Sequence, residues 1–215
     1  MIAALYVETN GVYYGLENVD PWDEQRDARL YDGPWPVVAH PPCQRWCRFA
    51  KGIERQYPHY RVGDDGGCFE AALQAVRRFG GVLEHPAHSL AWDAFELPVP
   101  YKNGGWVTNI SGGWSAYVEQ GRYGHPMRKA TWLYATVTPD LRWGHTPDNA
   151  MLGEFKWGSR LYKPEHDRNR PRVDSQHSLT PLAFRDALIA MAESANRQVT
   201  LVAAARSREQ QEPQA

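Results

Sequence analysis

Short apolar runs alternate with polar, glycine- and proline-rich stretches along the 215 residues of the chain. Runs of β-branched and other apolar residues predict strands at "PVVAH", "GVLEHP" and "KATWLYATV", and at residues 115–119. Apolar positions at helical spacing predict one helix over "GCFEAALQAVRRFG" and another over "TPLAFRDALIAMAESA". In the second helix we expect Thr180 as N-cap, Pro181 as the first helical residue, and Leu182, Leu188 and Met191 on one stripe.

The N-terminal segment "AALYVETNGVYYGL" has the pattern of a β-hairpin. Asn10 and Gly11 stand between alternating apolar residues, which is the strongest short hairpin signal. We therefore expect residues 12–14 to pair back onto residues 5–8. A further short strand is predicted at residues 28–31.

The succession of strand, helix and strand over residues 36–86 predicts parallel pairing through a right-handed crossover. We expect one α/β domain over residues 1–200, with a mostly parallel sheet and a C-terminal helix packed on it. Residues 138–176 show no periodicity and predict an irregular insert. The polar tail, residues 201–215, is expected to fray.

Composition narrows the class of protein. A hydrophobic fraction of 42% and a charged fraction of 23% are ordinary for a globular protein. A net charge of −1 gives no general attraction to nucleic acid or membrane, so a nucleic-acid surface would have to be a local patch. Without a leader or a long apolar run we expect a cytoplasmic protein that does not contact membranes. Its three cysteines lack a disulfide framework, which suits a reducing compartment.

Two side chains that carry chemistry follow predicted strands. Cys43 comes just after "PVVAH", and Glu84 lies at the end of "GVLEHP". In a parallel sheet such strand ends meet at one edge, so we expect the two to be neighbours. His40 and Arg45 nearby would lower the pKa of the thiol, as a nucleophile requires. The alternatives are an inert buried thiol and a carboxylate that caps a helix or pairs with an arginine.

These segments resemble cytosine-C5 DNA methyltransferases. "PPCQRWCRFAKG" is similar to the family's Pro-Cys-Gln catalytic loop, and "GVLEHP" is similar to its Glu-Asn-Val element, with His85 in place of Asn. "RYGHPMRKATWLYA" resembles the later Tyr-Gly, Pro-Gln and arginine element, with Met127 in place of Gln. "TPLAFRDALIAMAES" is similar to the closing helix. The resemblance implies a Rossmann-like methyltransferase sheet in a reduced form of the family, because the large target-recognition domain is missing.

The resemblance also implies a mechanism. Cys43 would add to C6 of cytosine, Glu84 would bind the N3 and amino edge, and Arg128 or Lys129 would hold the base or its phosphate. It further implies substrate contacts from a set of flanking residues, namely Gln44, Trp46, Tyr123 and His85. The substrate would be DNA, as a single strand or a flipped base, or a pyrimidine nucleotide.

The family's cofactor is S-adenosylmethionine. If "LYVETNGVYYGLE" is a degenerate form of the family's cofactor loop, the resemblance assigns Gly11, Gly15 and Glu17 to binding of S-adenosylmethionine. The hairpin interpretation of the same segment instead predicts weak binding or none. The two interpretations differ in where residues 12–14 lie.

Two other classes of function compete. A zinc-dependent nucleobase enzyme would draw ligands from a group of histidines and cysteines, namely His40, Cys43, Cys47, His85 and His88. Their order is the reverse of the zinc deaminase signature. The third class is a catalytically inactive methyltransferase-like protein that binds nucleic acid, with its tryptophans used for stacking or for the core.

Overall fold

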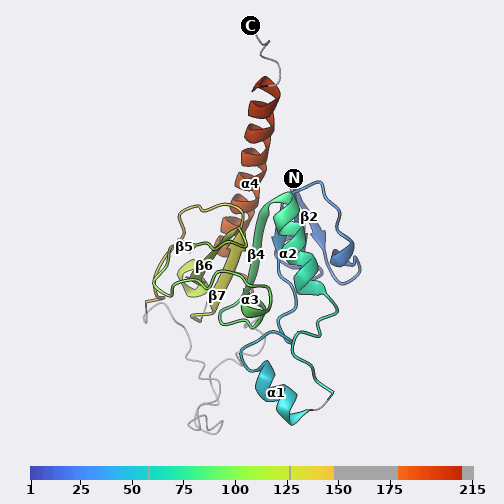
Figure 1. Cartoon of the computed structure of the whole chain (residues 1–215), viewed down its shortest axis with the longest axis vertical. Coiled ribbons are helices and arrows are strands. Elements are labelled where there is room, and N and C mark those ends of the chain that lie inside the picture. The colour runs from blue at the N-terminus through green and yellow to red at the C-terminus, as the bar shows by residue number, and fades with distance from the viewer. Residues whose placement is uncertain (58, 126, 148–178, 210–215) are drawn as a thin grey trace.

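The computed structural model describes residues 1–57, 59–125, 127–147 and 179–209. Seven strands form one sheet in the order β2-β1-β3-β4-β7-β6-β5 (Figure 1). Their bounds are β1 Ile2–Leu5, β2 Val19–Trp22, β3 Val37–Ala39, β4 Gly81–Pro86, β5 Trp106–Val107, β6 Trp114–Glu119 and β7 Ala130–Ala135. The predicted strands at "PVVAH", "GVLEHP", 115–119 and "KATWLYATV" are confirmed. Most of the irregular stretch expected at residues 138–176 lies outside the described residues.

The sheet is mixed, with a parallel half and an antiparallel half. Strands β2, β1, β3 and β4 pair in parallel, whereas β7, β6 and β5 join them through antiparallel ladders. The antiparallel ladders hold more residue pairs, so the expectation of a mostly parallel sheet is wrong, while the α/β class is confirmed. The physical reason is the short connection from β6 to β7, which contains only the 3₁₀ helix η2 (Gln120–Tyr123) and a turn and is too short for a crossover.

The predicted N-terminal hairpin does not form. β1 pairs in parallel with β2 on one edge and with β3 on the other, so no edge remains for residues 12–14. Those residues continue in turns, where the Gly11 amide donates to the Glu8 carbonyl and the Tyr14 amide to the Gly11 carbonyl. β1 is buried along its whole length, and parallel neighbours on both sides give its backbone groups hydrogen-bond partners away from water.

Helix α2 (Cys68–Phe79) connects β3 to β4, and the predicted parallel crossover is confirmed. Residues 28–30 form the 3₁₀ helix η1 instead of the expected strand, because the Asp27 side chain accepts a hydrogen bond from the Arg29 amide and caps this turn. Two short helices had no clear sequence signal. These are α1 (Ala50–Gln56) and α3 (Ala91–Ala94).

The C-terminal helix α4 (Leu182–Glu209) is longer than its predicted counterpart. It begins one residue later than expected, since the Phe184 and Arg185 amides donate to the Pro181 carbonyl, and this places Pro181 before the first turn. Leu188 and Met191 are buried as predicted, but Leu182 is exposed and Phe184 takes its place in the core. Residues 201–209 continue the helix where a frayed tail was expected.

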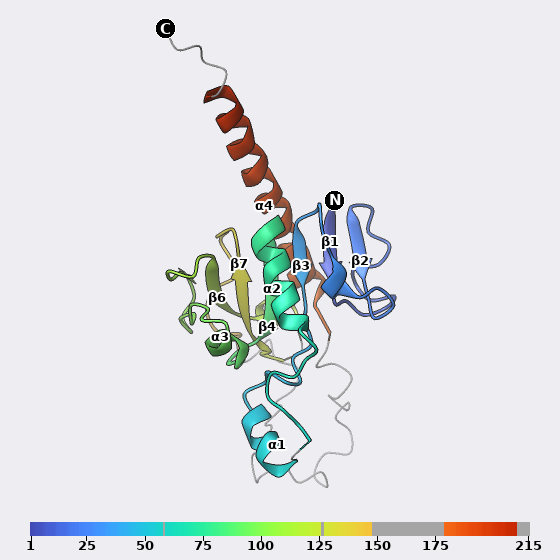
Figure 2. The same ribbon diagram turned by 45° about the vertical axis from the view of Figure 1, so that its right-hand side comes forward.

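Helices cover both faces of the sheet (Figure 2). On one face α2 packs on β3 and β4 through a core that includes Phe69, Leu73 and Trp92. On the other face α4 packs on β1, β3 and β4 through Phe184 and Leu188. The parallel half of the sheet therefore lies between helices on both faces. No helix among the described residues is long and apolar enough to cross a membrane.

Candidate active site

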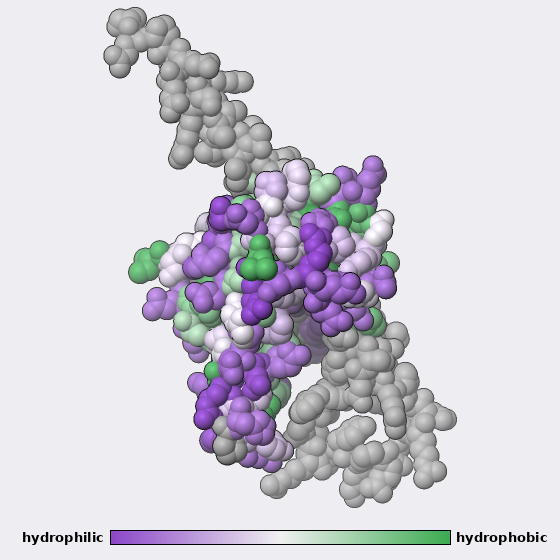
Figure 3. All heavy atoms as spheres, turned by 90° about the vertical axis from the view of Figure 1, so that its right-hand side faces the viewer, coloured by the Kyte–Doolittle hydropathy of each residue, from purple (hydrophilic) through white to green (hydrophobic). Residues whose placement is uncertain are grey.

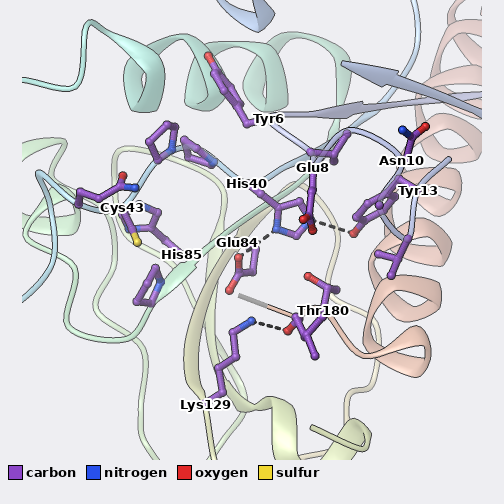
Figure 4. Close-up of a pocket in the computed structure, with 18 residues that line it drawn as sticks. Tyr6, Glu8, Asn10, Tyr13, His40, Cys43, Glu84, His85, Lys129 and Thr180 are labelled. Atoms are coloured by element: carbon purple, nitrogen blue, oxygen red, sulfur yellow. Dashed lines mark hydrogen bonds and ion pairs between the residues drawn. The ribbon is translucent and has the colours of Figure 1, made fainter. Parts of the chain in front are cut away.

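A cavity of about 730 Å³ opens at the carboxyl ends of β1, β3 and β4 (Figure 4). Its walls come from residues 6–8 after β1, residues 40–44 after β3, and residues 84–86 of β4. From β1 the chain moves outward to β2 and then returns to β3 on the opposite side of β1. This reversal of direction is the topological switch point at which open α/β sheets bind their ligands.

A chain of hydrogen bonds crosses this end of the sheet and fixes Glu84. His40 Nδ1 lies 3.0 Å from Glu84 Oε2, and His40 Nε2 lies 2.9 Å from the Tyr13 hydroxyl. Gln120 Nε2 donates to Glu84 Oε1 at 3.1 Å and to Thr131 Oγ1 at 3.0 Å. Because a carboxylate only accepts, His40 donates from Nδ1 to Glu84, and this hydrogen bond fixes the orientation of the carboxylate. Each oxygen of Glu84 keeps a lone pair that none of these hydrogen bonds uses.

Charges around the cavity keep Glu84 ionised. Burial by itself would raise the pKa of Glu84. The hydrogen bond and electrostatic attraction of His40, followed by the positive charge of Lys129, outweigh it, so this pKa lies below its ordinary value. Burial lowers the pKa of Lys129, and the negative charge of Glu84 opposes that change. A fixed carboxylate and a partly desolvated ammonium group therefore face the same space.

The Cys43 thiol is protonated in the free protein. Burial raises the pKa of this thiol, and the nearby Glu84 carboxylate raises it further, whereas Lys129 has a smaller effect in the opposite direction. The expected lowering by His40 and Arg45 does not occur. Both nitrogens of His40 are engaged with Glu84 and Tyr13, and the Arg45 guanidinium stacks on Tyr60 with its Cζ 4.2 Å from the ring centroid.

The structure brings most of the predicted nucleophile site together. Cys43, Glu84 and Lys129 line one cavity, as Figure 4 shows, and the prediction that they share a cleft at the strand ends is confirmed. Gln44 and His85 line it as well. The backbone of Lys129 has a strained φ of +36°, and its ammonium group donates to the Leu179 carbonyl at 2.7 Å.

Three predicted site residues lie elsewhere. Arg128 is directed toward Glu119, with its Nε 3.5 Å from Oε2, and does not line the cavity. Trp46 is buried against Phe69, and Tyr123 is buried against Phe184. Both aromatic rings are needed to fill the core, and for this reason the structure corrects their assignment to substrate binding.

The described residues do not fit S-adenosylmethionine in the way that the resemblance implies. Gly11 lines the cavity, but a Cβ there would lie 2.8 Å from the Glu8 carbonyl oxygen, so the turn itself requires the glycine. Gly15 and Glu17 lie outside the cavity, and no helix carries Glu17. Asp23, the acidic residue after β2, accepts hydrogen bonds from Thr9, Tyr14 and the Gln25 amide and does not reach the cavity.

Within the described residues, no group of three or more His, Cys, Asp or Glu side chains could hold a metal ion. His85 illustrates why the predicted zinc ligands do not converge. Its ring packs edge-on against Phe69 and beside Trp92, in the interior of the aromatic core. Burial lowers the pKa of His85 to about 4, so the ring is neutral.

Sequence reasoning missed the roles of Tyr13, Gln120 and Tyr6. Tyr13 was placed in a hairpin, and Gln120 follows a strand without any motif. Tyr6 directly follows β1, lines the cavity and has a φ of +58°. Positive φ is unusual for an aromatic residue and is typical of functional sites, but no sequence signal announces it.

Comparison of the chain with models of protein families, with curated proteins and with solved structures gave no match. The function therefore rests on the geometry of the cavity.

Proposed function

We propose that this protein is an enzyme that modifies a pyrimidine base, with cytosine as the expected base, by covalent attack of Cys43 on C6. The observation that carries the proposal is the meeting of Cys43, Glu84 and Lys129 in one cavity at the switch point of the sheet. A Rossmann-like, methyltransferase-type origin of the fold belongs to the same proposal. Its support is the parallel half of the sheet and the reversal of strand order at β1.

The residues divide the chemistry among them. Glu84 accepts hydrogen bonds from the amino group of the base and from the N3–H that forms during attack. The Glu84 carboxylate takes the thiol proton and passes it to N3 as the sulfur bonds to C6, while the positive charge of Lys129 stabilises the thiolate that forms. The π electrons of the C5=C6 bond move toward C5 and N3, N3 gains a proton, and C5 becomes nucleophilic.

Such an adduct makes the hydrogen at C5 exchange with water. C5 accepts a solvent proton, then loses its original one, and expulsion of the thiolate restores the base and the Cys43 thiol. This exchange requires no co-reactant except water. It therefore tests the proposal without any assumption about the group that the enzyme adds to C5.

The test is deuterium exchange at C5 of cytosine, in dCMP and in a short single strand, followed by mass spectrometry. An oligonucleotide that contains 2-pyrimidinone should in addition form an adduct of the protein plus one strand, because this electron-poor ring favours thiol addition. We expect Cys43→Ala to abolish both signals. The matched variant Cys47→Ala should retain both, because Cys47 does not line the cavity. Exchange that survives in Cys43→Ala would refute the proposal.

A second pair of variants separates the two candidate cations. Lys129→Met should lower the exchange rate by about a hundredfold, since it removes the positive charge that stabilises the forming thiolate. Arg128→Met should change the rate by less than about threefold, because Arg128 is directed toward Glu119 and away from the cavity. Equal losses in the two variants would contradict the assignment of Lys129. A protein that binds strands but shows neither exchange nor adduct would instead be the inactive nucleic-acid-binding protein.

A further inference from the structure

Residues 44–63, which we call the arm, project from the body of the molecule beyond the strand ends (Figures 1 and 2). The arm begins at the residue after Cys43 and contains helix α1. It closes on itself at its base, where the Gly63 amide donates to the Arg45 carbonyl at 3.0 Å and the Tyr60 hydroxyl donates to the Gln44 carbonyl. The arm is therefore a compact loop whose base lies at the edge of the cavity.

The arm carries a concentration of positive charge that the whole chain lacks. The chain has 24 Lys and Arg against 25 Asp and Glu. Within the arm there is a single acidic residue, Glu54, whose carboxylate accepts a hydrogen bond from the Val62 amide of the arm itself. Against it stand five basic residues, namely Arg45, Arg48, Lys51, Arg55 and Arg61. All but Arg45 are exposed, and the arm forms a strongly hydrophilic projection below the body in Figure 3.

Exposed aromatic rings alternate with these charges. Phe49 is 46% exposed and Tyr57 is 47% exposed, which is unusual for large rings on such a polar segment. The Arg48 guanidinium lies over the Phe49 ring, with its Cζ 4.5 Å from the centroid. Arginine beside an exposed ring is the combination that binds a phosphate and stacks a base.

The base of the arm is anchored in the core. Trp46 is buried, packs on Phe69 and Phe95, and donates from its indole N–H to Asp65 at 2.8 Å. The Leu90 amide donates to the Trp46 carbonyl at 2.8 Å. Cys43 lies three residues from this anchor, so a ligand on the arm is held at a fixed position relative to the cavity.

We propose that the arm binds a single-stranded nucleic acid and presents one of its bases to the Cys43 cavity. This inference rests on the proposed function and names its substrate class as a polynucleotide rather than a free nucleotide. The cavity lies at the strand ends, where only a base that has left its stack can enter, and a single strand supplies such a base at the lowest cost. The arm then supplies the phosphate contacts and stacking surfaces that bind a strand with little dependence on sequence.

The experiment measures binding separately from chemistry. Full-length Cys43→Ala protein is titrated against fluorescent dC12, rC12 and a 12-base-pair duplex, and anisotropy is followed at several salt concentrations. We expect single strands to bind more tightly than the duplex. Comparison of dC12 with rC12 shows which sugar is preferred. Adding R48Q, K51Q and R55Q together should flatten the slope of log affinity against log salt by about 2, because three phosphate contacts are lost. Adding F49A should weaken binding at least about fivefold.

The control carries the same change of charge away from the arm, in R26Q, R78Q and K102Q together. These three side chains are exposed and lie outside residues 44–63. We expect this control to bind like the parent. The inference is overturned if the arm variant binds like the parent, if the control loses as much, if the duplex binds as tightly as the single strand, or if polyglutamate displaces the strand at equal charge concentration.

The two proposals fail differently. If dCMP exchanges at C5 but no strand binds through the arm, the inference is wrong and the proposed function stands. If strands bind through the arm but neither exchange nor adduct appears, the arm assignment stands and the chemistry is wrong.

Discussion

His85 should make the folded protein sensitive to mild acid. The ring is 1% exposed and packs against Phe69 and Trp92. Neither of its nitrogens has a hydrogen-bond partner within 3.5 Å among the described residues. The negative charge of Glu84 and the Pro42 carbonyl favour the charged ring, but burial outweighs them. A proton on this imidazole would therefore place an unpaired charge inside the aromatic core.

The size of the effect follows from the pKa. In the folded protein burial lowers the pKa of His85 to about 4, whereas the unfolded chain has the ordinary value of 6.5. Between these two values the unfolded state binds the proton and the folded state does not, so the free energy of unfolding falls as the pH falls. One pKa unit corresponds to about 1.4 kcal/mol, which gives a loss of up to about 3 kcal/mol between pH 6.5 and pH 4. Well above pH 6.5 neither the folded nor the unfolded state binds this proton, and the full free energy of unfolding is present.

Urea denaturation of the wild type and of His85→Leu, repeated from pH 7.5 to pH 4, measures the contribution. Ionised carboxylates with lowered pKa, such as Glu84, also destabilise the protein in acid, but they act in both proteins and cancel in the difference. We expect the two to differ little at pH 7.5, and the variant to be more stable by about 3 kcal/mol at pH 4. Two curves that stay parallel over this range would show that His85 is not buried and neutral.

Two further predictions concern the support of the site. Replacing Gln120 by Leu removes the donor to Glu84 Oε1 and should lower the rate of C5 exchange by about tenfold or more. Gln120→Glu should in addition move the acid limb of the pH–rate profile to higher pH, because a second carboxylate raises the pKa of Glu84. A purely structural role would leave that profile in place. Replacing Gly81 by Ala should destabilise the fold by at least about 3 kcal/mol in urea denaturation, since a Cβ there would lie 1.9 Å from the Val37 carbonyl oxygen and Gly81 has a φ of +120°. Near-wild-type stability of that variant would mean that β3 and β4 are not in the register described.

The centre of the fold could be predicted because its signals are local and redundant. The run before Pro41, the helical spacing around Leu73 and the run ending at Glu84 each specify one element, and the crossover rule then fixes their pairing. For the same reason the proximity of Cys43 and Glu84 at the strand ends could be predicted from the sequence. Lys129 was one of two candidates, and the structure separates them because Lys129 lines the cavity whereas Arg128 is directed toward Glu119.

The errors arise where distant segments decide local structure. Asn10 and Gly11 have strong hairpin chemistry, but β1 reaches two parallel partners, and satisfying both of its edges outweighs a local turn preference. Trp46 and Tyr123 matched a motif, yet their rings fill gaps in the core. The hydrogen bond between Gln120 and Glu84 joins residues 36 positions apart and has no sequence signature.

One wall of the cavity is formed jointly by residues from the start of the chain and by residues that precede helix α4. Residues 179 and 180, directly before α4, line the same cavity as Tyr6 and Tyr13, and Arg185 donates to the Val12 carbonyl across 173 positions of sequence. During synthesis the chain leaves the ribosome from its N-terminus, so the apolar face of β1 and of the turn after it is covered only after α4 has been made. Contacts between such distant segments also slow folding. The thiol of Cys43 thus becomes enclosed only after residues 179–185 have been synthesised, and a chain truncated before them has no assembled cavity in which the thiol could react.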